Sequence, residues 1–211
     1  MYRHLAKIGK KILVLCFRLR YSHTGISVGK RTLLTSSKVK DTGANNCIRI
    51  GKDVIMKSCS FSFWGSDNTI IIEDGAKLHG VHFSVEDSGN RIHVGKKTTF
   101  FGRTHLSSCE GCSLTIGEDC MFSHDIDIRT TDSHSILKDG VRINGAKDIR
   151  IGNHVWIGMQ TLILKGADIP DRCVIGARST VSSSSMEPGC MYVGSPARLI
   201  ERGIEWKRER I

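Results

Sequence analysis

The chain has 211 residues, of which 39% are hydrophobic and 25% are charged, with 22 glycines and 3 prolines. This composition indicates one domain with a sizeable core, and it excludes a collagen, a disordered chain and a disulfide-stabilised miniprotein. The longest apolar run near the start, Ile12–Phe17, is far shorter than the roughly 20 residues needed to cross a bilayer.

The formal net charge of +10 is concentrated near the start of the chain. Residues 1–40 contain ten Lys or Arg and no Asp or Glu, whereas the rest of the chain is balanced. Apolar residues recur there at helical spacing, so we expect a basic amphipathic helix over residues 1–22. Such a helix either covers the open end of the domain or binds an anionic membrane surface through residues 1–20. We expect no nucleic-acid partner, because no motif that recognises one is present.

The eight cysteines would allow disulfides, but the chain lacks the features of a secretory signal. We therefore expect reduced, buried thiols in a cytoplasmic protein, with a peripheral position at the inner face of the cell membrane if the first helix binds lipid. The pair Cys109 and Cys112 has no partner pair at zinc-finger spacing, so we expect no metal.

An internal repeat follows the basic segment. Aliphatic residues fall 22 residues apart, and asparagines keep the same step upstream. The next counterpart comes 35 residues on, which is 22 plus an insertion of 13, and the step then shortens to six. The 22-residue positions are Val28, Ile50, Ile72, Val94 and Ile116, with Asn46, Asn68 and Asn90 upstream, and the six-residue positions are Ile151, Ile157, Ile163, Ile169, Ile175 and Val181.

A period of six fits neither a helix nor an ordinary strand. It fits short strands joined by tight turns, each strand directing one aliphatic side chain into a shared core. One coil of such strands cannot bury its own apolar face, so the coils stack into a solenoid. We therefore predict an all-β parallel solenoid over residues 23–195. A short C-terminal helix is predicted over residues 196–211, because Ser195 and Pro196 suit a helix start.

The 13-residue insertion predicts a loop near residues 129–148 that leaves the solenoid and carries His134. A long loop on a rigid scaffold is a usual place for a functional residue. A neutral imidazole is well matched to removing a proton from an alcohol at pH 7, with a carboxylate or a carbonyl holding its tautomer. The candidates for that carboxylate are Asp125, Asp127 and Asp132, and His124 is the alternative base.

Over residues 26–200, these repeats resemble those of the bacterial hexapeptide-repeat acyltransferases. The ending Gly194-Ser195-Pro196-Ala197 is similar to the Gly-Asn-Pro-Ala that is common in that family. The insertion looks most like that of the sugar and polysaccharide O-acetyltransferases, including those of polysialic acid. The shared motifs are Met121-Phe122-Ser123, Arg129-Thr130, Asp132-Ser133-His134 and His154-Val155-Trp156.

The resemblance implies a left-handed parallel β-helix and a homotrimer with active sites between subunits. It implies O-acetyl transfer from acetyl-CoA to a hydroxyl of a cell-surface glycan, with His134 as general base and Trp156 beside the acceptor. The cofactor is implied to lie against the C-terminal coils, where the candidate contacts are Gly158, Met159, Lys165, Gly176, Ala177, Ser182 and Arg198.

Three other functions remain open from the sequence. The same solenoid hosts N-acetyltransferases that act on nucleotide-linked amino sugars. It also hosts zinc hydratases resembling the γ-class carbonic anhydrases, although the acyltransferase-like ending disfavours them here. A non-catalytic solenoid that binds a polyanion through its basic start is the third.

Overall fold

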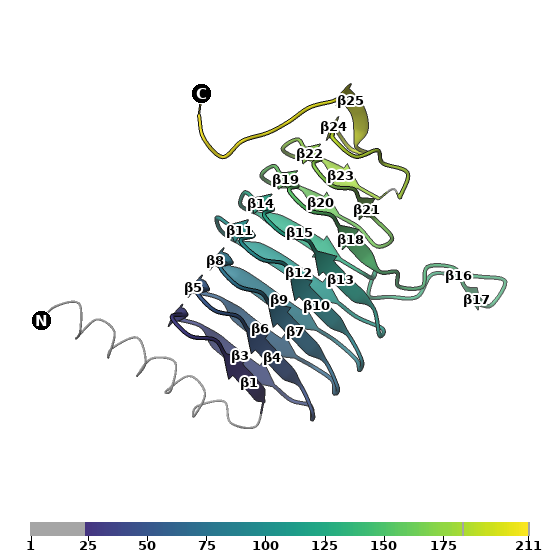
Figure 1. Cartoon of the computed structure of the whole chain (residues 1–211). Coiled ribbons are helices and arrows are strands. Elements are labelled where there is room, and N and C mark those ends of the chain that lie inside the picture. Colours follow the sequence, from purple (N-terminus) through teal and green to yellow (C-terminus); the bar gives the residue numbers. More distant parts are fainter. Residues whose placement is uncertain (1–23, 183, 211) are drawn as a thin grey trace, which may run out of the picture.

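The computed structural model describes residues 24–182 and 184–210. The predicted N-terminal helix, residues 1–22, lies outside the described residues. Within them the chain forms 25 strands and no helix, so the all-β prediction is confirmed. The strands wind into a stack of coils with three flat faces, and Figure 1 shows the faces running the length of the stack. The described residues contain no helix that could cross a membrane.

Each face of the solenoid is one sheet, built from one strand of every coil. The first sheet contains β1 (Gly25–Val28), β4 (Cys47–Ile50), β7 (Thr69–Ile72), β10 (Arg91–Val94), β13 (Ser113–Ile116), β18 (Ile149–Ile151) and β21 (Asp168–Ile169). The second contains β2 (Leu33–Thr35), β5 (Ile55–Lys57), β8 (Lys77–His79), β11 (Thr99–Phe100), β14 (Met121–Phe122), β19 (Trp156–Ile157), β22 (Val174–Ile175), β24 (Cys190–Val193) and β25 (Arg198–Arg202). The third contains β3 (Lys38–Asp41), β6 (Ser60–Phe63), β9 (Val81–Val85), β12 (Thr104–Ser108), β15 (Ile126–Arg129), β20 (Leu162–Ile163) and β23 (Thr180–Val181).

The register of the parallel strands confirms the predicted ladder. Ile50, Ile72, Val94, Ile116 and Ile151 are paired in succession along the first sheet. In the later coils a step of six residues takes the chain from one sheet to the next, so three steps complete a coil. The inward side chains of all coils therefore form one continuous core.

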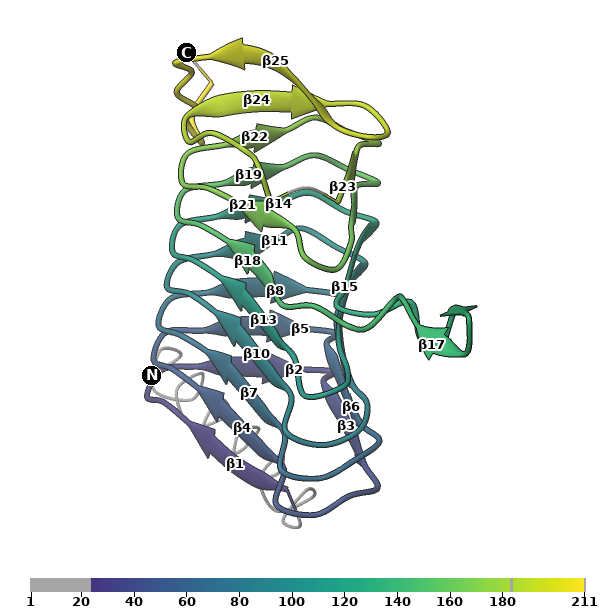
Figure 2. The same ribbon diagram turned by 90° about the vertical axis from the view of Figure 1, so that its right-hand side faces the viewer.

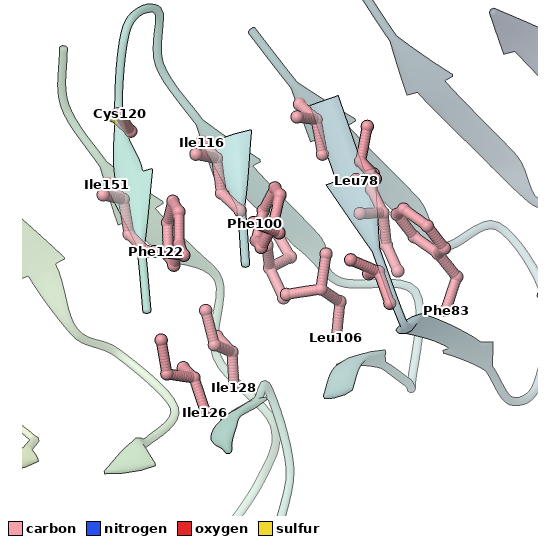
Figure 3. Close-up of a cluster of buried hydrophobic side chains, with 14 of the residues drawn as sticks. Leu78, Phe83, Phe100, Leu106, Ile116, Cys120, Phe122, Ile126, Ile128 and Ile151 are labelled. Carbon is pink, nitrogen blue, oxygen red and sulfur yellow. The ribbon is translucent and has the colours of Figure 1, made fainter. Parts of the chain in front are cut away.

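The core is filled by aliphatic and aromatic side chains that stack on their counterparts. The rings of Phe61 and Phe83 lie 4.9 Å apart, and those of Phe100 and Phe122 lie 4.4 Å apart, nearly parallel in both cases. Figure 3 shows this packing beside Leu78, which is fully buried. With its interior filled in this way, the solenoid offers chemistry only on its outer faces and corners.

The corner between the third and first sheets is held by a column of buried asparagines. The backbone N–H of Asn68 donates to the Asn46 side chain at 3.0 Å, and the N–H of Asn90 donates to the Asn68 side chain at 2.8 Å. These side chains replace hydrogen bonds that the turns cannot make with backbone groups. The 22-residue asparagine spacing in the sequence thus has a structural cause.

The insertion forms a hairpin at the same corner, as predicted. It contains β16 (Leu137–Lys138) and β17 (Val141–Arg142), which pair antiparallel. Figure 2 shows the hairpin projecting from the solenoid between β15 and β18. Its arms carry the exposed apolar side chains of Ile136, Leu137, Val141 and Ile143, which flank the turn at residues 139–140.

The predicted C-terminal helix is wrong. Residues 198–202 form β25, which pairs antiparallel with β24 and covers the last open edge of the second sheet. An unpaired strand edge offers a row of backbone hydrogen bonds, and pairing with it outweighs the local preference of Ser195 and Pro196 for a helix start. After β25 the chain turns back without regular secondary structure and buries Trp206 against an earlier coil.

Replacing Phe100 by Ala should destabilise the protein by about 3–5 kcal/mol, because a buried ring leaves a cavity against Phe122. Replacing the next residue, Phe101, should cost less than about 0.5 kcal/mol, since its ring is 62% exposed. Denaturant unfolding of both variants measures the difference. Equal losses of unfolding free energy would contradict the assignment of Phe100 as inward-facing and Phe101 as outward-facing.

Candidate functional site

Asn144 organises the loop that carries His134. Its side chain is buried, and its Oδ1 accepts a hydrogen bond from the backbone N–H of Ile136 at 2.7 Å. Its Nδ2 donates to the backbone oxygen of His134 and to a carboxylate oxygen of Asp132, each at 2.8 Å. One amide group therefore fixes the backbone on both sides of the hairpin.

An ion pair ties the same loop to the next coil. The Lys165 ammonium contacts the Asp132 carboxylate and donates to the backbone oxygen of Asn144 at 2.7 Å. Hydrogen bonds from Lys165 and Asn144 lower the pKa of Asp132, so it stays ionised at neutral pH. Because this carboxylate already binds Lys165 and Asn144, it is engaged in holding the loop.

A second ion pair ties the hairpin to the preceding coil. Arg142 donates to both oxygens of Glu110, at 2.6 and 2.8 Å, and the Thr131 hydroxyl donates to the same carboxylate at 2.8 Å. These hydrogen bonds lower the pKa of Glu110 to about 2. The bidentate geometry fixes the direction of the hairpin as well as its position.

His134 itself is exposed at the base of this braced hairpin. Its backbone N–H donates to the oxygen of Asp132 at 2.8 Å. The described residues provide no hydrogen-bond or ion-pair partner for its imidazole. The ring is thus presented to solvent on a fixed backbone. The carboxylate or carbonyl expected to hold its tautomer is not among its contacts in the described residues, since Asp125, Asp127 and Asp132 are engaged elsewhere.

The other histidines near the site are held by neighbours. The Nδ1 of His124 lies 3.1 Å from Asp125, which also pairs with Arg103. His154 has both ring nitrogens engaged, one with Asp119 and one with the backbone oxygen of Trp206. Of the histidines within or beside the loop, His134 is therefore the most available for chemistry.

Trp156 lies on a different face from His134. It begins β19 in the second sheet and is 39% exposed, whereas the hairpin leaves the corner between the third and first sheets. Figures 1 and 2 both place the hairpin well away from β19. A single chain therefore does not bring the two predicted catalytic-site residues together.

Four of the predicted cofactor contacts meet at the corner between the second and third sheets. Gly158 and Met159 follow β19, and Gly176 and Ala177 follow β22 one coil later. A side chain on Gly158 would meet the backbone N of Ala177 at 2.5 Å, so only glycine allows the coils to approach here. Gly158 is itself buried, whereas Met159 and Ala177 are exposed at this corner.

The other three predicted cofactor contacts, Ser182, Arg198 and Lys165, lie away from this corner. Ser182 and Arg198 line one hollow of about 220 Å³ beside β23 and β25. Lys165 lies at the opposite corner, engaged with Asp132, so its predicted contact with a CoA phosphate stays a prediction. The sequence did not point to Glu110, Arg142 or Asn144, although the Asn144-Gly145 pair is a recognisable turn signal.

The described residues include no group of three or more His, Cys, Asp or Glu that could hold a metal ion. The seven cysteines in the described ranges are free, and six are buried. Burial raises the pKa of the Cys120 thiol to about 12. A thiol in this state is a poor nucleophile, so the exposed imidazole is the better candidate for chemistry.

Comparisons with known proteins show which family the chain resembles. No protein-family model matches the chain. The sequence is 35% identical to the polysialic acid O-acetyltransferase of Neisseria meningitidis over 195 residues, which are 90% of each chain. The crystal structure of the polySia-specific acetyltransferase NeuO has a TM-score of 0.82 and 31% identity, covering 89% of this chain and 86% of that one. The structure of the polysialic acid O-acetyltransferase OatWY has a TM-score of 0.75 and 29% identity, covering 88% and 93%.

The solenoid and these likenesses define an acyltransferase of the hexapeptide-repeat, left-handed β-helix class. Within that class, the chain belongs to the acetyltransferase family that includes the polysialic acid O-acetyltransferases.

Replacing Glu110 by Gln should loosen the hairpin at neutral pH. The folded-state pKa of Glu110 lies below its ordinary value of 4.5, so its stabilisation is complete above that value and is lost as the pH falls towards about 2. Hydrogen exchange over residues 136–143, compared with the unaltered protein at the same pH, should be faster in the variant at pH 6, and the two rates should converge only as the pH falls towards about 2.

The matched control is Glu118→Gln, which removes the exposed Glu118–Lys96 pair away from the hairpin. Equal exchange in the Glu110→Gln variant and the unaltered protein at pH 6 would show that this ion pair does not hold the hairpin.

Proposed function

We propose that the protein transfers an acetyl group from acetyl-CoA to a hydroxyl of a cell-surface polysaccharide, such as capsule, exopolysaccharide or lipopolysaccharide, or of its precursor. The observation that carries the proposal is the exposed His134 imidazole on a hairpin braced by Glu110, Asp132 and Asn144. The names of the relatives make polysialic acid the first acceptor to test. The reaction belongs in the cytoplasm in this proposal, where acetyl-CoA is available, with residues 1–20 as the candidate contact with the inner membrane surface.

In the proposed reaction, His134 removes the proton of the acceptor hydroxyl as its oxygen attacks the thioester carbonyl carbon. The new carbon–oxygen bond gives a tetrahedral intermediate, which collapses as the carbon–sulfur bond breaks. The departing CoA thiolate takes the proton from the His134 imidazolium, so the base is restored. No cysteine carries the acetyl group in this scheme, since the buried thiols are out of reach.

The donor is proposed to lie along the corner formed by Gly158, Met159, Gly176 and Ala177. An extended pantetheine arm would contact the exposed side chains of Met159 and Ala177 at this corner. The hollow lined by Ser182 and Arg198 lies at the end of the same coils, and a guanidinium and hydroxyls there suit the phosphates of CoA.

The proposed active site lies between two subunits of a homotrimer. His134 and Trp156 stand on separate parts of one chain, so a second copy must supply one of them if both contact the same acceptor. The exposed apolar side chains on the arms of the hairpin, which include Leu137 and Val141, are suited to contact that second copy. An interface of this kind repeats around a threefold axis.

Replacing His134 by Ala should lower kcat at least about a hundredfold, because the acceptor hydroxyl loses its base. Binding of acetyl-CoA should persist, and a thermal-unfolding shift with acetyl-CoA measures it. His124→Ala is the matched control and should retain most activity. Unchanged turnover in His134→Ala, or equal loss of donor binding, would contradict the assignment.

The product distinguishes the acceptor classes. An O-acetyl ester on polysialic acid is cleaved by mild base, whereas an acetamide on an amino sugar is stable. Transfer to amines alone would replace the proposed reaction with N-acetylation.

Co-expression of His134→Ala and Trp156→Ala chains should restore activity that neither variant has alone. In random mixed trimers, about a quarter of the interfaces combine an intact His134 from one chain with an intact Trp156 from its neighbour. Activity near that fraction supports a shared site. Absence of any restored activity in verified mixed trimers would contradict a site that combines His134 of one subunit with Trp156 of another.

A further inference from the structure

The C-terminal tail, residues 203–210, has contacts that neither the fold nor the proposed reaction has explained. After β25 it turns back and follows the corner between the first and second sheets. The N–H of Ile204 donates to the oxygen of Gly189 at 3.0 Å, and farther along the tail Trp206 contacts His154 and Arg208 contacts Asp119. The tail therefore links coils that otherwise contact only their neighbours.

Trp206 is the centre of these contacts. It is 5% exposed, and its ring stacks on that of His154 with centroids 4.1 Å apart and an interplanar angle of 10°. Its Nε1 donates to the backbone oxygen of His154 at 2.8 Å, and its own backbone oxygen lies 3.1 Å from the Nε2 of His154. Trp206 thus holds both the ring and the backbone of His154.

Arg208 fixes the tail to the coil that contains Asp119, which is one coil earlier in the chain than the coil of His154. Its Nε and Nη2 donate to Asp119 Oδ1 at 3.2 and 3.0 Å, and its Nη1 donates to the Thr99 hydroxyl at 2.9 Å. Its Nη2 also donates to the backbone oxygens of Asp119 and Cys120, each at 3.1 Å. The second oxygen of Asp119 lies 2.8 Å from the Nδ1 of His154. Asp119 therefore joins the Arg208 contact to the Trp206 contact.

This cluster lies directly behind Trp156. Trp156 is two residues from His154, and its ring centroid lies 6.2 Å from that of Trp206 at an angle of 49°. Trp156 keeps 39% of its surface exposed, whereas Trp206 is buried and cannot itself contact an acceptor. The buried ring supports one side of the exposed ring and limits its rotation.

The contacts of the tail are not explained by a need to cover the edge of the second sheet. The edge of β24 is already paired with β25, which ends at Arg202. The contacts made by Trp206 and Arg208 fall instead on the coils of β19, β14 and β11, two of which lie at or beside Trp156 in the second sheet. The tail is thus directed at the coil that presents the exposed tryptophan.

We propose that the C-terminal tail is a positioning element, in which Trp206, fastened by Arg208, holds Trp156 in the orientation that lines the acceptor site. This inference rests on the proposed function, because it gives Trp156 a role at the acceptor. Trp206 and Arg208 are positioning residues and touch neither substrate.

The test compares Trp206→Ala and Arg208→Met with Lys207→Gln, which alters the exposed residue between them. In the 211-residue chain, Trp206→Ala should raise the KM for the polysaccharide acceptor by about tenfold, equivalent to about 1.4 kcal/mol. The KM for acetyl-CoA should stay unchanged, and Lys207→Gln should leave both values unaltered. Trp206→Phe keeps the ring stack but cannot donate to His154, so it should give a smaller rise, and it serves as the test if Trp206→Ala does not fold.

A second readout is independent of activity. Protein labelled with 5-fluorotryptophan gives a fluorine resonance for Trp156, assigned by its loss in Trp156→Phe. Arg208→Met and Trp206→Phe should shift and broaden that resonance, and Lys207→Gln should not. An unmoved resonance, or equal rises in both KM values, would overturn the positioning role. Absence of acetyl transfer by the unaltered protein would overturn the proposed function instead, and the resonance would still report whether the tail holds Trp156.

Discussion

In-register stacking of parallel strands is the constraint on which this molecule depends. Each coil places its inward aliphatic side chain on that of the coil before it, as Ile72, Val94 and Ile116 show. Once the inward positions are fixed, the outward residues fall in columns on three faces, and the turns fall in columns along three corners. The interior is filled, so every functional group has to stand on a face, on a corner or on a segment that leaves the stack.

This constraint explains how much of the fold the sequence could predict. The 22-residue step and the six-residue step both follow from counting residues round the same three faces, so the coils, their register and the place of the insertion were predictable. The N-terminal helix lies outside the described residues. The C-terminal helix was wrong because the open edge of β24 and the packing of Trp206 are properties of the assembled stack, and the local signal at Ser195 contains neither.

The candidate site was predictable only in part, for a related reason. His134 stood out because it lies in the one interruption of a regular ladder. The groups that brace it did not, since Glu110 and Arg142 are 32 residues apart and Asp132 and Lys165 are 33 apart. Neither separation is a multiple of a coil, because the hairpin turns away from the register. Contacts that depend on the path of an insertion do not follow the repeat period, so a single sequence does not reveal them.

The number of residues that connect the third sheet to the first differs from coil to coil, and this has a further consequence. In this corner β6 and β7 are joined by five residues and β20 and β21 by four, whereas β15 and β18 are joined by the whole hairpin, and the inward ladder is the same on both sides of it. The residues inserted here leave the inward ladder in register. Insertions and deletions at this corner therefore alter an outer surface of the molecule while the core stays the same.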